Sequence, residues 1–220
     1  MLEWIIATFA PFSCLYCGDE GQYICNYCLV RACPAVPSRC YSCRTATENF
    51  RTCRRCRSRS GLYSVYVCTD YSDCAKRLIQ AFKFERVQSL AAQLGFRMST
   101  TLPELIENTS IIPVPTATSH IRQRGYDHAS LLARKISKHS KHEILFAVLK
   151  LNQVRQVGAK RQTRLKQLKN GFGLTRGDFY GKDVVLVDDV LTTGATLEEI
   201  AKLLKSAGAR RISAVVFAQT

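Results

Sequence analysis

The chain has 220 residues, of which 46% are hydrophobic, and it carries a formal net charge of +15. This length allows one large domain, or an ordinary domain with a small one, and no apolar run approaches the roughly 18 residues of a membrane span. The positive charge indicates polyanionic partners, either nucleic acid or phosphorylated small molecules.

The first residues are apolar but do not have the pattern of a signal peptide. They lack a basic region and include Glu3, so we interpret them as a packing segment. We therefore expect a cytoplasmic protein. In such a compartment, eleven cysteines are more consistent with metal ligands than with disulfides.

Four Cys-x-x-Cys pairs stand between residues 14 and 56. A tight turn can present two thiolates to one tetrahedral ion, and two such turns complete the coordination. Two successive zinc ribbons are the simplest pairing, and a cross-braced pairing (first with third, second with fourth) stays open. Four thiolates per ion leave no position for chemistry, so we expect two structural zinc ions. The expected ligands are Cys14, Cys17, Cys25, Cys28, Cys40, Cys43, Cys53 and Cys56.

The distribution of charge separates this zinc ribbon module, residues 1–60, from a second domain at residues 61–220. Residues 1–60 have a net charge of +4, which two ions each bound by four thiolates would cancel. Residues 120–182 hold fifteen Lys and Arg against three acids, a net charge of +12. The basic surface is therefore expected downstream. Three cysteines outside the pairs, Cys33, Cys68 and Cys74, are expected to be small buried hydrophobes.

After Gly61 the pattern becomes that of an α/β domain. Residues 62–68 alternate partly like a strand, and residues 74–84 and 87–98 have apolar side chains at helical spacing. Aromatic and charged residues interleave around Lys83, which makes it a candidate for contact with nucleic acid. Aromatic anchors under a solvated helix end are the more common alternative.

A second short buried strand is predicted at residues 111–115, closed by prolines. Hydroxyl side chains and arginines follow it, and these can grip a pyrophosphate; the candidates are Thr116, Arg122 and Arg124. The four histidines have no regular metal spacing, so we expect solvated or hydrogen-bonded roles for them.

Residues 155–169 are basic and nearly free of large apolar side chains. Such a run is usually a solvated surface, and it could also follow a nucleic-acid backbone. The candidates for nucleic-acid contact are Arg155, Lys160, Arg161, Lys166 and Lys169.

The most informative stretch begins at Val184. Its four apolar residues predict a parallel strand covered on both faces, and ligands in such sheets lie beyond the carboxyl ends of the strands. There, Asp188 and Asp189 could accept hydrogen bonds from sugar hydroxyls or hold a hydrated metal ion. The small loop after them would surround an anion with amides and hydroxyls at a helix N-terminus. This loop comprises Val190, Leu191, Thr192, Thr193, Gly194, Ala195 and Thr196.

A helix is expected after this loop, with a capping box from Thr196 to Glu199. Another buried strand at residues 211–217 would complete a βαβ unit.

The stretch from Val184 to Thr196 resembles the 5-phosphoribosyl-1-pyrophosphate (PRPP) signature of type I phosphoribosyltransferases. The resemblance implies that the acidic pair holds ribose hydroxyls, that the loop holds the 5′-phosphate, and that Mg²⁺ accompanies PRPP. In those enzymes the interval before the acidic-pair strand often carries a loop that closes over pyrophosphate, a further possibility for residues 155–169.

A second resemblance narrows the family. Pro113-Val114-Pro115 followed by Arg-Gly-Tyr-Asp-His at residues 124–128 is similar to elements of the ComF competence-protein family, whose members carry Cys-x-x-Cys ribbons before a phosphoribosyltransferase domain. Gln156, Arg164 and Phe172 fall at the spacing of that family, and Arg164 becomes a further pyrophosphate candidate. Asp127-His128 replaces the usual Asn-Gln, and Gln167 replaces a common Asn.

We therefore expect an α/β fold, with an N-terminal zinc ribbon module of four-cysteine sites before a type I phosphoribosyltransferase-like domain with a mainly parallel sheet. The resemblance implies a protein of DNA uptake and natural transformation that binds PRPP, or a related phosphoribosyl ligand, and single-stranded DNA. Other DNA-uptake proteins, such as a helicase, are possible partners. The alternative is an active phosphoribosyltransferase of nucleotide or nucleobase metabolism. No acceptor-base segment is recognisable, so turnover stays an open question.

Overall fold

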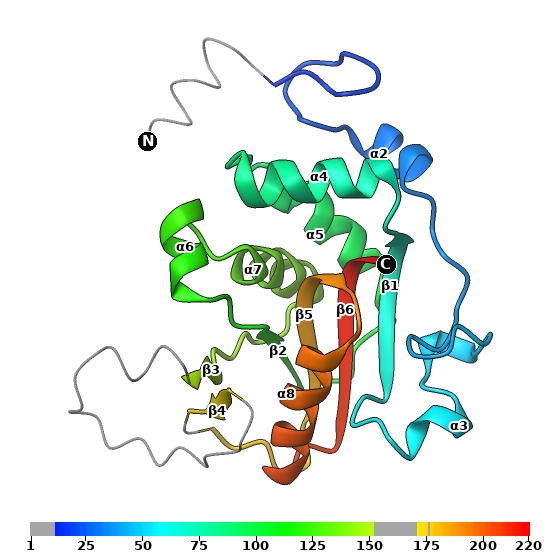
Figure 1. Ribbon diagram of the computed structural model, residues 1–220, viewed down its shortest axis with the longest axis vertical. Coiled ribbons are helices and arrows are strands. Elements are labelled where there is room, and N and C mark those ends of the chain that lie inside the picture. The colour runs from blue at the N-terminus through cyan, green and yellow to red at the C-terminus, as the bar shows by residue number, and fades with distance from the viewer. Residues whose placement is uncertain (1–11, 152–170, 176) are drawn as a thin grey trace.

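The computed structural model describes residues 12–151, 171–175 and 177–220. Its centre is a parallel sheet of four strands in the order β1-β6-β5-β2 (Figure 1). Parallel pairing places the carboxyl ends of all four strands at one edge, as expected for a sheet that binds ligands there. The strands are β1 (Ser64–Asp70), β2 (Thr109–Pro113), β5 (Asp183–Leu191) and β6 (Arg211–Gln219).

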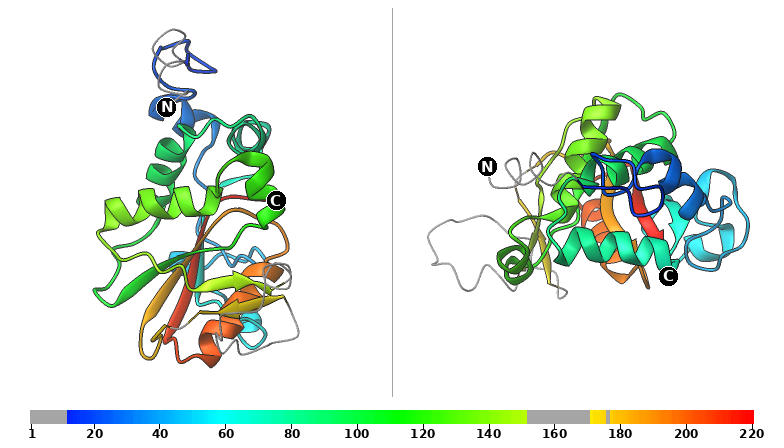
Figure 2. Two further views of the ribbon diagram at one scale, coloured as in Figure 1. Left: turned by 90° about the vertical axis from the view of Figure 1, so that its left-hand side faces the viewer. Right: turned by 90° about the horizontal axis from the view of Figure 1, so that it is seen from above.

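Helices cover both faces of this sheet (Figure 2). Successive residues of β5 point to opposite faces: Val185 and Val187 belong to the buried cluster under three helices, whereas Val184 and Leu186 belong to the cluster under one helix. The apolar run therefore forms a doubly covered strand, as predicted. The three helices are α4 (Asp73–Phe84), α5 (Leu90–Thr101) and α7 (His128–Ser140), and the single helix is α8 (Ala195–Ser206).

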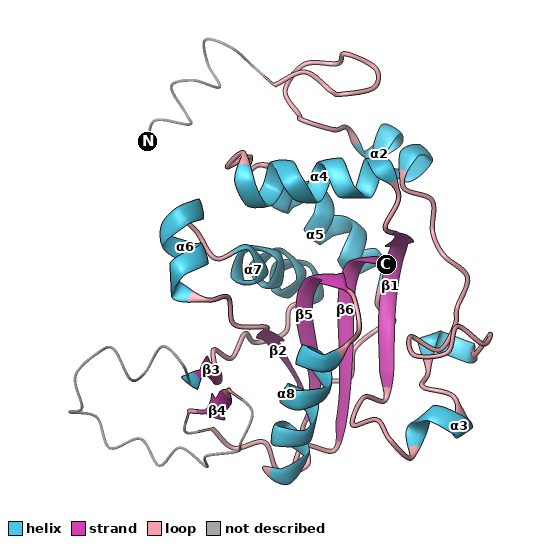
Figure 3. Cartoon of the chain, viewed as in Figure 1, coloured by secondary structure: helices cyan, strands magenta, loops and turns pink. Residues whose placement is uncertain are grey.

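Smaller elements complete this domain (Figure 3). Helix α6 (Thr118–Arg124) follows β2, and β3 (Val148–Lys150) pairs antiparallel with β4 (Phe172–Leu174). Across the described part of the chain, every helix is too short or too polar to cross a membrane.

The cysteine-rich region is packed onto the α/β domain in two places. Its short helices are α2 (Asn26–Ala32), η1 (Glu48–Phe50) and α3 (Arg54–Arg57). The first half lies beside α4, and the second half lies beside β1 (Figure 1). Ile24 and Leu29 join the buried cluster of α4 and α5, whereas Tyr41 joins that of α8. A domain boundary at residue 60 stays a prediction.

Two details of the strand–loop–helix differ from expectation. Strand β5 continues to Leu191, so Asp188 and Asp189 lie within the strand and not after it. The predicted capping box is wrong, because α8 begins at Ala195 after Gly194, whose φ of 79° is left-handed and which caps without a side chain. Glycine adopts this conformation without steric cost.

Candidate phosphoribosyl-binding site

A cavity of about 540 Å³ opens at the carboxyl ends of β2 and β5, a size typical of small-molecule sites. Helix α4 forms one wall, α6 and the start of α7 form another, and the loop after β5 closes the base. The polar and aromatic side chains that line it include Tyr71, Lys83, Phe84, Thr116, His120, Arg124, His128, Asp188, Asp189, Thr192 and Thr196.

Asp189 is the most buried acid of the cavity, with 2% of its surface exposed. Lys83 Nζ lies 2.8 Å from its Oδ1, and His128 Nε2 lies 3.1 Å from its Oδ2. Burial raises the pKa of Asp189, but the hydrogen bond from His128 and the charge of Lys83 outweigh burial and hold the pKa below its usual range. Asp189 is therefore an ionised acceptor at neutral pH.

His128 links Asp189 to Arg124. Arg124 Nη1 lies 3.1 Å from His128 Nδ1, and a guanidinium can only donate. The Nδ1 atom must accept, so the neutral ring carries its proton on Nε2, facing Asp189. Arg124 also lies over the ring of Phe84, 4.9 Å from its centroid. Arg124, His128, Asp189 and Lys83 thus form one connected row of polar side chains.

Asp188 differs in protonation from its neighbour. It is half-buried, and its Oδ1 accepts a hydrogen bond of 2.9 Å from the Asp189 amide. Burial, together with the charge of Asp189, raises the pKa of Asp188 to about 7. The two carboxyl groups therefore have different roles: one is a permanent acceptor and the other titrates near neutrality.

The acidic pair suits sugar hydroxyls better than direct coordination of a cation. One ligand atom each from His128, Asp188 and Asp189 lie within 4.8 Å of one another, close enough to hold a metal ion. However, Asp189 already faces Lys83 and His128, and Mg²⁺ usually keeps several of its waters and binds through substrate phosphates.

The loop after β5 has the form of an anion cradle. Thr192, Thr193 and Thr196 are exposed, and Thr193 Oγ1 accepts a 3.3 Å hydrogen bond from the Ala195 amide. The loop enters the twelve-residue helix α8 directly, whose first-turn amides and dipole favour an anion. A phosphate loop at residues 190–196 stays a prediction; Val190 and Leu191 belong to β5, and residues 192–194 form the loop itself.

Two of the pyrophosphate candidates line the cavity and one does not. Thr116 lines the cavity and donates a 2.9 Å hydrogen bond to Asp127, which caps α7. Arg124 also lines the cavity, whereas Arg122 is exposed and is not among the lining residues. The remaining candidates lie outside the described residues: Arg155, Lys160, Arg161, Arg164, Lys166 and Lys169.

Two cavity side chains were not expected there. Lys83, predicted as a surface contact for nucleic acid, is 19% exposed and pairs with Asp189 within the cavity. His128 was predicted to be solvated or hydrogen-bonded; it is hydrogen-bonded, but it also lines the cavity. The sequence contained one indication that His128 belongs to the site: it directly follows the Arg-Gly-Tyr-Asp motif.

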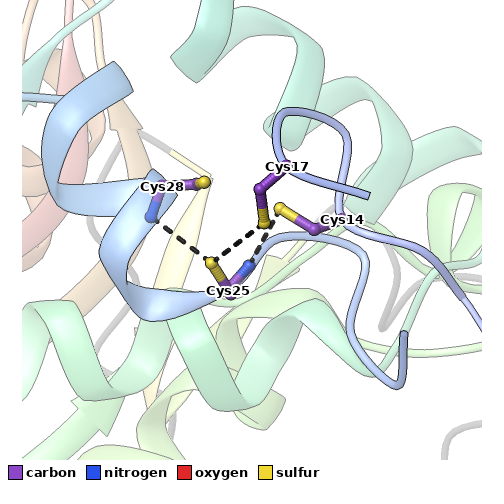
Figure 4. A group of neighbouring side chains, drawn as sticks. All are labelled: Cys14, Cys17, Cys25 and Cys28. Atoms are coloured by element: carbon purple, nitrogen blue, oxygen red, sulfur yellow. Dashed lines mark hydrogen bonds between the residues drawn. The ribbon is translucent and has the colours of Figure 1, made fainter. Parts of the chain in front are cut away.

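The cysteine pairs form two separate clusters. The first four pairing cysteines converge (Figure 4), and so do the last four, so the pairing is sequential and the cross-braced alternative is wrong. The clusters are Cys14, Cys17, Cys25, Cys28 and Cys40, Cys43, Cys53, Cys56.

The spacing of the sulfurs fits zinc. A tetrahedral ion with bonds of about 2.3 Å separates its sulfurs by about 3.8 Å. Cys17 and Cys25 have their Sγ atoms 3.8 Å apart, and Cys43 and Cys53 have theirs 3.6 Å apart. Each cluster could hold one zinc ion with no open position. Outside the clusters, Cys33 and Cys68 are buried, as predicted, and Cys74 is half-buried.

Comparison with known proteins agrees with this geometry. Residues 121–220 match the model of the phosphoribosyl transferase domain. The chain is 30% identical to Competence protein F of Haemophilus influenzae, over 93% of this chain and 96% of that one. It is 27% identical to Competence protein ComFC of Bacillus subtilis, over 77% and 78% of the two chains. It is 28% identical to the DNA utilization protein YhgH of Escherichia coli K12, over 86% and 87%.

Proposed function

The chain belongs to the ComF family of competence proteins, and from this premise we propose that it binds PRPP, or a related phosphoribosyl ligand, as part of the cytoplasmic handling of single-stranded DNA. Its relatives are named for competence and DNA utilization. One structural observation carries the ligand assignment: an ionised buried aspartate and a hydroxyl-rich helix N-terminus face the same cavity.

Each part of the ligand has a counterpart in the cavity. The acidic pair, Asp188 and Asp189, accepts from the ribose hydroxyls, and the loop at residues 192–196 donates to the 5′-phosphate. Arg124 and Lys83 contribute positive charge to the lining of the cavity, where a pyrophosphate with its Mg²⁺ would extend. Zinc in the two cysteine clusters has a structural role.

The test of the ligand is calorimetric titration of the zinc-loaded protein with PRPP and Mg²⁺. Asp188→Ala combined with Asp189→Ala should abolish binding, because both hydroxyl acceptors are lost. Arg122→Ala is the matched control, since this arginine is exposed outside the cavity, and it should retain the affinity of the wild type. Equal PRPP affinity in the double variant would contradict the site.

The DNA part of the proposal rests on charge and on the names of the relatives. Binding of single-stranded DNA should weaken steeply with salt, because phosphate contacts release counterions. The Asp188→Ala, Asp189→Ala variant should keep this binding, since it loses no positive charge. A salt-independent interaction, or none at low salt, would contradict it. Partners such as a helicase would then act on the same strand.

A catalytic alternative is favoured by one observation. Helix α4 and the residue after β1 form a wall over the cavity that includes Tyr71, Gln80 and the 59%-exposed Phe84, and aromatic rings of this kind can stack on a base. This wall could therefore supply the contacts with an acceptor base that we did not recognise in the sequence. Pyrophosphate release in the presence of PRPP and candidate bases would establish turnover.

A further inference from the structure

The second cysteine cluster touches the phosphate loop through one side chain, Tyr41. This tyrosine stands between two cluster residues, Cys40 and Cys43, and it is 8% exposed. Its ring packs directly on Gly194: a Cβ atom at that glycine would lie 3.1 Å from Tyr41 Cε2. The metal-binding turn and the phosphate loop are therefore in van der Waals contact.

Hydrogen bonds fix the hydroxyl end of Tyr41. It donates to Glu198 Oε1 in the first turn of α8, and Ser60 Oγ lies 3.0 Å away. The other oxygen of Glu198 accepts a 2.8 Å hydrogen bond from the Gly61 amide.

The main chain of Tyr41 is held as well. Its carbonyl accepts a 2.8 Å hydrogen bond from Gln219 Nε2 at the buried end of β6. The next residue, Thr220, donates its amide to Leu191 O at 3.0 Å, where β5 enters the loop. The turn of the second cluster is thus joined to the end of β6, which is in turn joined to the end of β5, and to the helix that follows the loop.

We propose that the metal ion of the second cluster sets the geometry of the phosphate loop through Tyr41, so that occupancy of this cluster and affinity for the phosphoribosyl ligand are linked. The inference rests on the proposed function, because it concerns the same site. An ion held by four cysteines fixes the turn that carries Tyr41, since the free energy of metal binding orders its ligands. Linkage is reciprocal, so the ligand must also retain the metal.

The first cluster provides an internal comparison. Tyr27 has the same kind of position, between Cys25 and Cys28, but it is 67% exposed and contacts Arg31 within its own helix. It belongs to the half of the cysteine-rich region that packs beside α4. A tyrosine in a metal-binding turn is therefore not sufficient; the contact with Gly194 and Glu198 distinguishes Tyr41.

The test uses the full, zinc-loaded chain, with PRPP and Mg²⁺ as the probe. Tyr41→Phe keeps the ring and loses the bond to Glu198, and it should weaken PRPP binding about tenfold, within the usual range of coupling between sites. Tyr27→Phe should bind like the wild type. Cys43→Ser and Cys17→Ser each remove one exposed ligand from one cluster. Cys43→Ser should weaken PRPP binding more, because only the second cluster contacts the phosphate loop. Circular dichroism establishes that each variant is folded. Zinc content should show two ions in the tyrosine variants and the loss of one ion in each cysteine variant.

A second measurement does not depend on any variant. Release of zinc to a chromogenic chelator should occur in two phases, and saturating PRPP should slow one phase several-fold. The slowed phase should be the one that Cys43→Ser removes. If wild type binds PRPP, but Tyr41→Phe binds equally well and PRPP leaves both release phases unchanged, the linkage is overturned and the proposed function stands. Absence of PRPP binding by wild type would overturn both.

Discussion

Lys83→Met should destabilise the protein, because the buried carboxylate of Asp189 loses the lysine cation that pairs with it. Asp189 is 2% exposed, and Lys83 Nζ is 2.8 Å from its carboxylate. Removing one partner of a fully buried ion pair costs about 3–5 kcal/mol. Methionine retains most of the apolar stem, so the loss is mainly that of the charge.

The expected cost is smaller than this range for two reasons. His128 remains beside the second oxygen of Asp189, and the Lys83 side chain is 19% exposed, so that solvent screens the pair. We expect roughly 1–3 kcal/mol. A protein of this size shifts its melting temperature by about 2–4 °C for each kcal/mol.

The sign of the pH dependence follows from the lowered pKa of Asp189. In the wild type its contribution to stability is complete above the unfolded pKa of about 3.9 and is lost as the pH falls through the lower folded value. Lys83→Met raises the folded pKa, so the difference between variant and wild type should be large at pH 7 and shrink below about pH 4.

Thermal unfolding at pH 7 and at pH 3 is the measurement, with wild type and variant compared at each pH, because both lose their zinc in acid. Lys83→Met combined with Asp189→Asn should cost less than the sum of the two single changes, because the double variant contains no unpaired buried charge. An unchanged melting temperature in Lys83→Met, or strict additivity in the double variant, would refute the pairing.

Three further predictions concern the same end of the molecule and its cysteines. Asp188 has a folded pKa raised to about 7, so its protonation stabilises the folded state fully below about pH 4, and this stabilisation is lost as the pH rises through 7. Chemical denaturation should show the free energy of unfolding fall over this pH range in the wild type and not in Asp188→Asn. The Sγ atoms of Cys33 and Cys74 lie 3.0 Å apart, so hydrogen peroxide, itself reduced to water, should oxidise the pair to a disulfide, and peptide mass spectrometry should find them cross-linked before Cys68 reacts. Gly194→Ala should lower the free energy of unfolding by at least about 1 kcal/mol because of the left-handed φ alone. The steric contact between the new Cβ atom and Tyr41 should add a further loss, which should disappear when Tyr41→Ala is introduced as well. Fully additive losses in the double variant would show that this contact contributes nothing.

The sequence predicted those parts of the structure that are encoded by neighbouring residues. The apolar run from Val184 to Val187 can only be satisfied by a strand covered on both faces, and the following loop needs no other segment to place hydroxyls at a helix N-terminus. The cysteine pairs were predictable for the same reason, since each turn contains both of its thiols. The grouping of the turns was not predictable, because it depends on how the intervening chain folds back.

The parts that escaped prediction depend on distant residues. Lys83 and Asp189 are 106 positions apart in the chain, and the helical pattern around Lys83 describes only which face of α4 is buried. Helix α7 was missed, because its buried positions include small Ala129 and Ala133 among charged residues, which weakens the apolar periodicity. With α7 absent from the prediction, no reasoning from pattern could place His128 beside Asp189.

Gly194 shows how a local motif can hide a long-range constraint. Within the sequence, a glycine at the start of a phosphate-binding helix is explained by its left-handed backbone. The structure adds a second reason, since the ring of Tyr41, 153 positions earlier in the numbering, fills the space beside the missing side chain. The same contact joins a cysteine cluster, which has no open coordination position, to the loop that would hold a phosphate. The two motifs that are separate in the sequence are therefore in contact in the folded chain, and in our proposal the second cysteine cluster supports the phosphate loop through Tyr41.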